Sequence, residues 1–492
     1  MNRPLKMIQK YSYDRAQVKA GILHIGVGNF HRAHEEYFTN KLLEDPSQRN
    51  WGICGAMLLP SDENLYRRLK AQGGEYTLTT CAPDGARVCH RIGSLVELLW
   101  AGDDAPAIHR KIADPAIKII TMTITEGGYN ISKSSGEFML QDEAVQHDLS
   151  NPHYPVTVFG HVAEGLRLRM QGGNNPITIQ SCDNLQHNGD TARKAFTSFF
   201  AAQDSAIAAG KGEPALSKWV EKNVSFPNSM VDRITPAVRQ ADIEELNRLN
   251  GSNDKAPVYC EDFIQWVIED RFMAGRPCWE RVGAEFTDDV TTYENMKLSL
   301  LNASHSLLCY PAFLLGYRKV DAAMGDPDIV RLVRDFMEKD ITPYVPEPKG
   351  IDLGEYKRSL ISRFSNPSIS DQVARLCFDG ASKFPVYIMP NLGRMLSDGA
   401  KTHRLAFLFA CYRHYLKYKV DDCGTAFKVD DPWLNEADWA VIDNGKADEF
   451  LGISPFGSVP LGEYPTFIGQ FLSDCDALTS GGVRPLIKKI NT

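Results

Sequence analysis

The chain has 492 residues, enough for two or three domains, and its 43% hydrophobic and 24% charged residues are typical of a soluble globular protein. The net charge of −8, without a long basic run, argues against nucleic acid or an anionic membrane as a partner. The sequence shows neither a membrane span nor the core of a signal peptide, so we expect a cytoplasmic protein.

Short apolar segments alternate with helix-like segments in the first half of the chain. Residues 21–26, 51–58, 118–125 and 177–181 have the β-branched, apolar composition of strands buried in the middle of a sheet. Because helical patterns separate these strands, the sheet is expected to be parallel. The fold class predicted is therefore α/β, with an N-terminal Rossmann-like domain.

The turn after the first strand has part of a dinucleotide-binding signature. Gly26 and Gly28 form its G-x-G, which allows a tight turn and a close approach of backbone to a pyrophosphate. His31 stands where the third glycine is expected, so the motif is incomplete. Asp62, after the second strand, is a candidate acceptor for ribose hydroxyls and would favour NAD over NADP, although it could equally cap the next helix.

Polar turns follow two later strands. Glu126 follows the segment 118–125, and Asn184 follows the segment 177–181. Open parallel sheets bind ligands beyond the carboxyl ends of their strands. Both turns are therefore candidates for ligand contacts.

Helical periodicity dominates after about residue 288, as in residues 329–338, 356–364 and 402–418. We predict a Rossmann-like dinucleotide-binding domain at 1–287 and a mainly helical substrate or catalytic domain at 288–492. No internal repeat or low-complexity tract interrupts this organisation.

The segment 293–305 begins this second half and combines polar and apolar residues unusually. Five leucines spread around most of its helix, which is therefore expected to be buried: Leu298, Leu300, Leu301, Leu307 and Leu308. At about 100° per residue, Lys297, Asn302 and His305 share an arc of roughly 140°. Desolvation makes a lysine suited to take a proton from an alcohol, and an amide can stabilise developing negative charge on oxygen. This trio is the candidate catalytic group.

A metal site is not expected. His31 and His34 have an H-x-x-H spacing, but no acidic or sulfur partner stands at a recognisable zinc distance. The eleven cysteines are scattered without a C-x-x-C pair and are interpreted as small core residues in a reducing compartment.

Six motifs, in chain order, resemble the polyol-specific long-chain dehydrogenases. They are GVGNFHRAH at 26–34, TITEGGY at 123–129, SCDN at 181–184, MVDRITP at 230–236, MKLSLLNASH at 296–305 and RFSN at 363–366. The resemblance runs from about residue 20 to the C-terminal region and is strongest to the mannitol-oxidising members of the family. It implies that the protein interconverts D-mannitol and D-fructose with a nicotinamide cofactor and without zinc.

The resemblance also implies roles for individual residues. Lys297 matches the general acid/base, Asn302 and Asn184 match the amides of an oxyanion hole, and His305 matches an imidazole that orients the substrate. Glu294 matches a proton relay to solvent. Substrate binding is expected from Asp232, Arg375 and Lys383. The residues expected at the cofactor are Gly26, Gly28, Phe30, His31, Arg32, Asp62 and Glu126.

Two other functions remain open at this point. A fructuronate reductase is the closest alternative, because Arg375 and Lys383 together could seat a carboxylate. The Glu126–Gly127 turn and the presence of Arg375 resemble the mannitol enzymes more closely. A nucleotide-binding sensor without catalysis, and a metal hydrolase built on His31 and His34, are the rivals from other classes. The resemblance suggests a monomer, and the residues leave the oligomeric state open.

Overall fold

The computed structural model describes residues 8–132, 135–173, 175–208, 215–369, 371–429 and 431–492. The chain divides into two compact units. The first extends to Thr291, apart from Pro83–Gly85, and the second comprises Pro83–Gly85 and Thr292–Thr492. Within the described ranges, no helix has the length and apolar character needed to cross a membrane.

A six-stranded parallel sheet forms the centre of the first unit. Its strands, in spatial order, are β5 (Leu95–Trp100), β2 (Gly52–Met57), β1 (Ala20–Ile25), β6 (Ile119–Met122), β7 (Ile177–Ser181) and β8 (Val224–Ser225). The strand order reverses between β1 and β6, as in a doubly wound nucleotide-binding fold. The predicted α/β class with a Rossmann-like N-terminal domain is confirmed.

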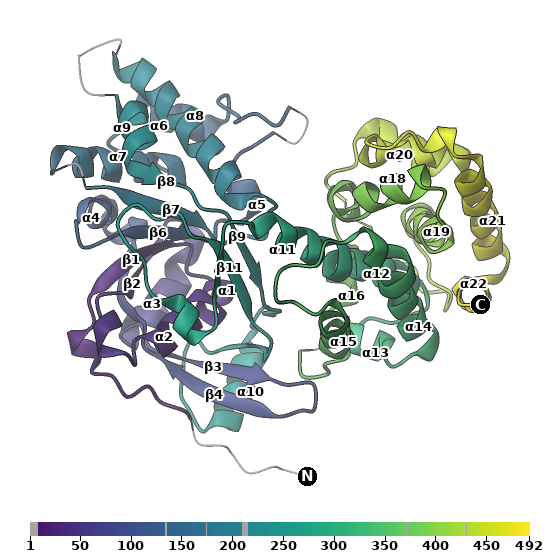
Figure 1. The fold of residues 1–492 in the computed structure, drawn as a ribbon, viewed down its shortest axis with the longest axis horizontal. Coiled ribbons are helices and arrows are strands. Elements are labelled where there is room, and N and C mark those ends of the chain that lie inside the picture. Colours follow the sequence, from purple (N-terminus) through teal and green to yellow (C-terminus); the bar gives the residue numbers. More distant parts are fainter. Residues whose placement is uncertain (1–7, 133–134, 174, 209–214, 370, 430) are drawn as a thin grey trace. The chain divides into compact units, whose positions relative to one another are not determined.

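Helices cover both faces of this sheet, which explains the continuous apolar strands that the sequence shows. On one face, strand residues such as Leu23 and Ile120 pack with Phe159 and Phe196, which belong to α7 (Val158–Gln171) and α8 (Asn188–Ala208). The opposite face packs with the helices α2 (Glu35–Leu42) and α3 (Glu63–Ala71). Figure 1 shows these two sets of helices in the purple-to-teal part of the chain.

Two three-stranded sheets and several short helices complete the first unit. One sheet has the order β10 (Val258–Glu261), β3 (Tyr76–Cys81), β4 (Arg87–Ile92), and the other β12 (Glu285–Thr287), β11 (Gln265–Glu269), β9 (Ser229–Asp232). The remaining helices are α1 (Asn29–Ala33), α4 (Ala101–Ala113), α5 (Thr125–Gly128), α6 (Glu143–Ser150), α9 (Leu216–Asn223) and α10 (Gln240–Asn250). Single turns of 3₁₀ helix lie at Arg15–Gln17, Pro46–Gln48, Pro60–Asp62 and Trp279–Val282.

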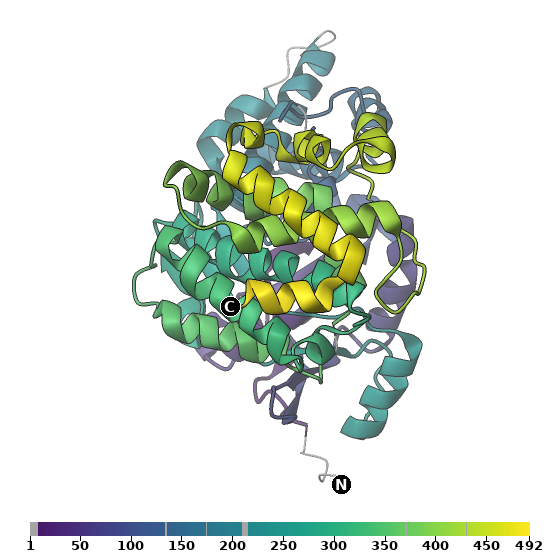
Figure 2. The same cartoon turned by 90° about the vertical axis from the view of Figure 1, so that its right-hand side faces the viewer.

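The second unit is mainly helical in its described residues, which confirms the predicted class of the C-terminal part. After α11 (Val290–Lys297), its α-helices are α12 (Ala303–Leu314), α13 (Val320–Ala323), α14 (Pro327–Asp335), α15 (Leu353–Phe364), α16 (Val373–Cys377), α17 (Gly380–Lys383), α18 (Met389–Ser397), α19 (His403–Tyr418), α20 (Glu436–Asn444), α21 (Pro465–Gly481) and α22 (Val483–Ile490). Its 3₁₀ turns are Thr342–Tyr344, Asp448–Gly452, Ser454–Phe456 and Leu461–Glu463. Figure 2 shows α21 and α22, in yellow, packed against α19.

Helix α12 is the most buried helix of this unit, as its leucines predict. Eleven of its twelve residues are buried, and α16 and α19 pack against it. The structure differs from the sequence expectation in having π-helical turns at Leu298–Asn302, Phe336–Ile341 and Phe384–Ile388. The helix expected at 329–338 accordingly begins at Pro327, capped by Asp326, and passes into a π turn after Asp335.

Candidate active site

The turn after β1 lies where the strand order of the main sheet reverses. Gly26 has φ +97°, and a Cβ at this position would lie 2.2 Å from the carbonyl oxygen of Thr123. Only glycine can therefore bring the turn this close to the end of β6. A Cβ at Gly28 would instead meet no atom nearer than the Gly26 oxygen, at 3.8 Å. This open surface beside a tight turn fits the approach of a dinucleotide pyrophosphate.

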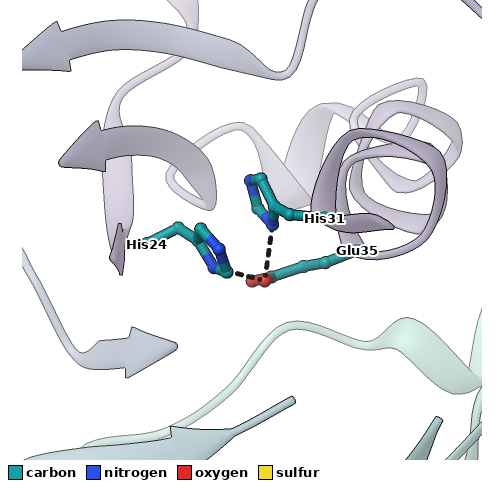
Figure 3. Close-up of side chains that lie close together, drawn as sticks. All are labelled: His24, His31 and Glu35. Atoms are coloured by element: carbon teal, nitrogen blue, oxygen red, sulfur yellow. Dashed lines mark ion pairs between the residues drawn. The ribbon is translucent and has the colours of Figure 1, made fainter. Parts of the chain in front are cut away.

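A buried network of two histidines and a glutamate, drawn in Figure 3, contacts this turn through His24. Glu35 Oε2 lies 3.0 Å from His24 Nδ1 and 3.2 Å from His31 Nδ1, and all three side chains are almost fully buried. Nε2 of His24 lies 3.2 Å from the Gly26 carbonyl oxygen and 3.0 Å from Thr123 Oγ1. The network thus links β1, α1, α2 and the end of β6.

Interactions among these side chains offset the desolvation that would otherwise neutralise Glu35 and His31. Burial alone would raise the pKa of Glu35, but hydrogen bonds from His24 and His31 outweigh it and hold the pKa well below its ordinary value. Burial lowers the pKa of His24 to about 4. Burial also acts to lower the pKa of His31, but hydrogen bonds to Glu35 and Glu36 raise it overall. Glu35 is therefore an anion whose main counter-charge is His31.

The same three residues place potential metal ligands within 4.8 Å of one another. The two imidazole rings are stacked, with centroids 3.3 Å apart and planes 10° apart, and Nδ1 of each ring approaches the same Glu35 oxygen. His34, the second histidine of the H-x-x-H spacing, faces a different partner, because its Nε2 lies 2.9 Å from the Gln265 carbonyl oxygen.

The side chains of the turn residues expected at the cofactor have partners within the protein. Arg32 is buried, donates to the carbonyl of Ala256, and bonds Asn29 Oδ1 at 2.7 Å. Phe30 stacks on His34, with ring centroids 5.0 Å apart. His31 belongs to the buried network. The side chains of His31 and Arg32 are buried, so any contribution of these two residues to cofactor binding comes from their backbone and from the shape that they give the turn, whereas Phe30 is partly exposed.

Asp62 and Glu126 lie on separate turns of the first unit. Asp62 follows β2, and its Oδ2 accepts a hydrogen bond from Leu59 N at 2.9 Å, so the carboxylate closes the 3₁₀ turn Pro60–Asp62. It makes no side-chain cap on the next helix, α3. Glu126 is exposed on α5, immediately after Thr125, whose φ of 65° is rare for a β-branched residue.

Asp183 holds the Thr125 turn in place, a role that the sequence did not indicate. Its carboxylate accepts hydrogen bonds from Ile124 N at 3.0 Å, from Thr125 N at 2.9 Å and from the Tyr129 hydroxyl at 2.7 Å. Asp183 also precedes the exposed Asn184, so one buried carboxylate joins two predicted ligand turns. Its position directly after a strand was the available signal.

Asn188 joins the end of β7 to β9, another link that the sequence did not indicate. It is fully buried, donates to the Ser229 carbonyl at 2.8 Å, and accepts from Ser229 N at 2.9 Å. Asp232 is the last residue of β9 and is buried. Arg233 bonds the carbonyls of Glu261 and Ala33. The arginine is thus engaged by backbone oxygens.

In the second unit, the candidate catalytic residues lie on one continuous helical rod, which consists of the end of α11, the π turn Leu298–Asn302 and α12. Lys297 ends α11 and is buried, with 6% of its surface exposed, and Glu294 is buried one turn earlier. Asn302 ends the π turn and His305 lies in the first turn of α12, both half-buried. In the π turn Ala303 N donates to the Leu298 oxygen, five residues back. Residues five apart therefore face the same side here, which brings Lys297 and Asn302 closer to alignment than α-helical spacing does.

Neighbouring helices hold this rod in place. The His305 ring packs on Phe364 of α15 with centroids 4.3 Å apart, which gives the RFSN motif a structural role. Asn391 of α18 donates to Ser299 Oγ, inside the π turn, at 2.9 Å. Oδ1 of Asn302 is buried and has no hydrogen-bond partner among the described residues. An unpaired amide oxygen can accept a hydrogen bond from a hydroxyl group of a ligand.

Arg375 and Lys383, expected to bind substrate, carry acidic partners. Nε of Arg375 bonds Asp371 Oδ1 at 2.8 Å, and its Nη2 bonds the other oxygen of the same carboxylate. Lys383 Nζ lies 2.7 Å from Asp379 Oδ1. Burial acts to raise the pKa of Asp371, but Arg375 and then the nearby His305 lower it overall. Asp371 therefore links the arginine electrostatically to the candidate catalytic helix.

Comparison with known proteins covers both parts of the chain. Residues 20–281 match the mannitol dehydrogenase Rossmann domain, and residues 289–479 match the mannitol dehydrogenase C-terminal domain. A polyol:NADP oxidoreductase of Gluconobacter oxydans is 42% identical over 90% of this chain and 89% of its own length. A mannitol 2-dehydrogenase of Pyrenophora tritici-repentis is 38% identical over 99% of this chain and 84% of its own.

Two solved structures are similar over nearly the full length. A D-sorbitol dehydrogenase in substrate-free form matches with a TM-score of 0.89 and 38% identity, covering 98% of this chain and 97% of its own. The mannitol 2-dehydrogenase of Pseudomonas fluorescens, solved as a ternary complex with NAD and D-mannitol, matches with a TM-score of 0.85 and 40% identity, covering 98% and 96%.

Proposed function

The chain belongs to the mannitol dehydrogenase family and is an oxidoreductase acting on a secondary alcohol, and we propose that it interconverts D-mannitol and D-fructose with NAD. The observation that carries this proposal is the buried Lys297, followed across a π turn by Asn302 and His305 on one helical rod. Such a group is suited to proton transfer at a hydroxyl next to a hydride donor or acceptor. We further propose residues 1–287 as the cofactor domain and 288–492 as the catalytic domain.

In this proposal Lys297 is the general acid/base. Its amine accepts the proton of the reacting C2 hydroxyl during oxidation and returns it to the carbonyl oxygen during reduction. A bound nicotinamide would supply the hydride acceptor or donor. Asn302 donates a hydrogen bond to the oxygen as its negative charge develops, and His305 orients the substrate. Glu294, buried one turn before Lys297, carries the proton toward solvent.

The first unit contributes two further candidates. Asn184 is proposed as a second amide donor to the reacting oxygen, and Asp232 as a substrate ligand. Both belong to motifs shared with the polyol dehydrogenases, and both lie at ends of strands that Asn188 ties together. The shape of the Gly26–Gly28 turn supports binding of the cofactor here.

The preference for NAD rests on Asp62 and on one relative. A carboxylate after β2 would repel a 2′-phosphate, and the similar Pseudomonas fluorescens enzyme was crystallised with NAD. The Gluconobacter oxydans relative, named for NADP, supports the other cofactor. A direct comparison of the two cofactors decides between them.

The test is oxidation of NADH by the purified protein, with D-fructose and D-fructuronate assayed in parallel and NADPH as the matched control. We expect turnover with D-fructose and NADH. Turnover restricted to D-fructuronate would replace the mannitol proposal by the sugar-acid alternative. Absence of turnover with both sugars and both cofactors would contradict the proposed function.

A further inference from the structure

Arg375 and Lys383, the two cations expected to bind substrate, each form an ion pair with a carboxylate four residues earlier in the chain. The guanidinium of Arg375 meets both oxygens of Asp371, a two-pronged pair that is stronger and more directional than a single contact. The arginine is largely exposed, with 62% of its side chain accessible, whereas only 12% of Asp371 is accessible. The acid is thus the more buried partner, and the arginine is the partner that solvent and a ligand can reach.

Lys383 is held in a similar way. Besides the 2.7 Å contact with Asp379, its ammonium donates to the carbonyls of Leu376 at 3.1 Å and Phe378 at 2.6 Å. An ammonium has three hydrogens, so these three acceptors occupy all of its donor capacity. Asp379 adopts a left-handed backbone conformation with φ 53°, which orients it at the start of α17.

The four side chains therefore form a group without net charge. The two pairs also interact electrostatically, because Asp379 acts on Arg375. His305 acts in the same way on Asp371. A sugar carboxylate would have to displace Asp371 from Arg375 or sit beside two carboxylates, and either costs free energy. A neutral polyol meets no such penalty. Its hydroxyls can accept from the N–H groups that Arg375 does not use for Asp371 and can donate to the carboxylates.

We propose that Asp371, assisted by Asp379, makes this site select neutral polyols and ketoses over sugar acids by neutralising Arg375 and Lys383. This inference rests on the proposed function. It adds a physical reason why the enzyme would accept neutral polyols and reject sugar acids. Asp371 is then a specificity-determining residue that acts through Arg375, and its removal exposes a cation suited to a carboxylate.

The experiment compares wild type with D371N, whose amide has the shape of the carboxylate without its charge. The measured quantity is the ratio of kcat/KM for D-fructuronate to that for D-fructose, with the preferred reduced cofactor. We expect the ratio to rise at least tenfold in D371N, mainly through a lower KM for D-fructuronate. The double variant D371N/R375A should lose this gain, because the gain requires the released arginine.

The matched control is D242N. Asp242 pairs with Arg239 through the same Nε and Nη2 atoms and lies in the first unit. Its removal should leave the ratio unchanged. D379N supplies a second variant should D371N fail to fold, because asparagine tolerates the left-handed backbone at this position. It should raise the ratio in the same direction.

Binding of D-mannonate, the sugar-acid product, gives a readout that does not depend on turnover. D371N should bind it at least tenfold more tightly than wild type in a calorimetric titration. An unchanged ratio and unchanged D-mannonate affinity in folded D371N, while wild type reduces D-fructose, would overturn the inference alone. A wild-type enzyme that prefers D-fructuronate would overturn both the inference and the choice of mannitol as substrate.

Discussion

Glu35 and His24 form a buried hydrogen-bonded contact beside the glycine turn, with 3.0 Å between Oε2 and Nδ1. The pair joins a helix to a strand, and His24 continues the link to the Gly26 carbonyl on its other nitrogen. The conformation of the turn is therefore set partly from inside the protein. This arrangement predicts that cofactor affinity and stability depend on a residue that the cofactor does not touch.

Glu35→Gln tests this dependence. The substitution leaves His24 without a carboxylate and His31 with Glu36 alone, and breaking a buried ion pair such as that of Glu35 with His31 costs on the order of 3–5 kcal/mol. We expect a lower melting temperature and a larger dissociation constant for NADH, measured by fluorescence titration well below the melting temperature. Glu63→Gln, at an exposed pair with Arg67, is the control and should change neither quantity. Wild-type affinity in Glu35→Gln would show that the turn does not need this support.

Lys297→Ala tests the general acid/base. The loss of a positioned proton donor and acceptor should lower kcat for D-fructose reduction by about 10²–10⁴-fold. The measurement is steady-state NADH oxidation at neutral pH, with folding checked by circular dichroism. Lys339→Ala is the control, because Lys339 is exposed and paired with Asp335 in the same unit. Near-full turnover in Lys297→Ala would remove the lysine from the mechanism.

Asn302→Ala tests the amide at the end of the π turn. If its side chain stabilises the developing oxyanion, the substitution should cost about 2.7–4 kcal/mol of transition-state stabilisation. We expect this loss in kcat, with the KM for D-fructose little changed. Asn444→Ala, at an exposed position in α20, serves as the control. A loss confined to KM would identify Asn302 as a binding residue instead.

The sequence was sufficient for the fold class, because strands buried on both faces must be apolar and helices must alternate with them. It was not sufficient for the π turn between Lys297 and Asn302, because hydrogen bonding over five residues depends on packing against neighbours such as Asn391. The His24–Glu35 pair depends on how a strand and a helix meet, which residue spacing does not encode.

The Arg375–Asp371 pair could have been recognised from the sequence. An acid four residues before an arginine is a common pairing that is visible without a structure, although Asp371 precedes helix α16 and does not lie within it. The resemblance directed attention to the arginine as a ligand and away from its neighbour. The structure adds that Asp371 is the more buried partner and that His305 lies within its electrostatic reach. That information is the basis for the proposed selection of neutral substrates over sugar acids.

Asp474 provides a prediction for the pH dependence of stability. Its side chain is fully buried on α21, its Oδ1 accepts from Gln470 at 2.7 Å, and burial raises its pKa to about 6. A carboxyl with an ordinary pKa of ~3.9 in the unfolded chain then binds its proton more tightly when folded. Its contribution to stability is full below about pH 4 and is lost as the pH rises through about 6, a change of about 3 kcal/mol.

The measurement compares the free energy of unfolding of wild type and Asp474→Asn in urea between pH 4 and pH 7.5. The variant carries no titrating group at this position, so the difference between the two proteins isolates the contribution of Asp474. We expect wild type to lose stability relative to the variant as the pH rises, mainly between pH 4 and pH 6. Asp476→Asn, an exposed neighbour on the same helix, should differ from wild type by a constant amount. A difference for Asp474→Asn that is also constant across this range would show that the carboxyl titrates alike in the folded and unfolded chains.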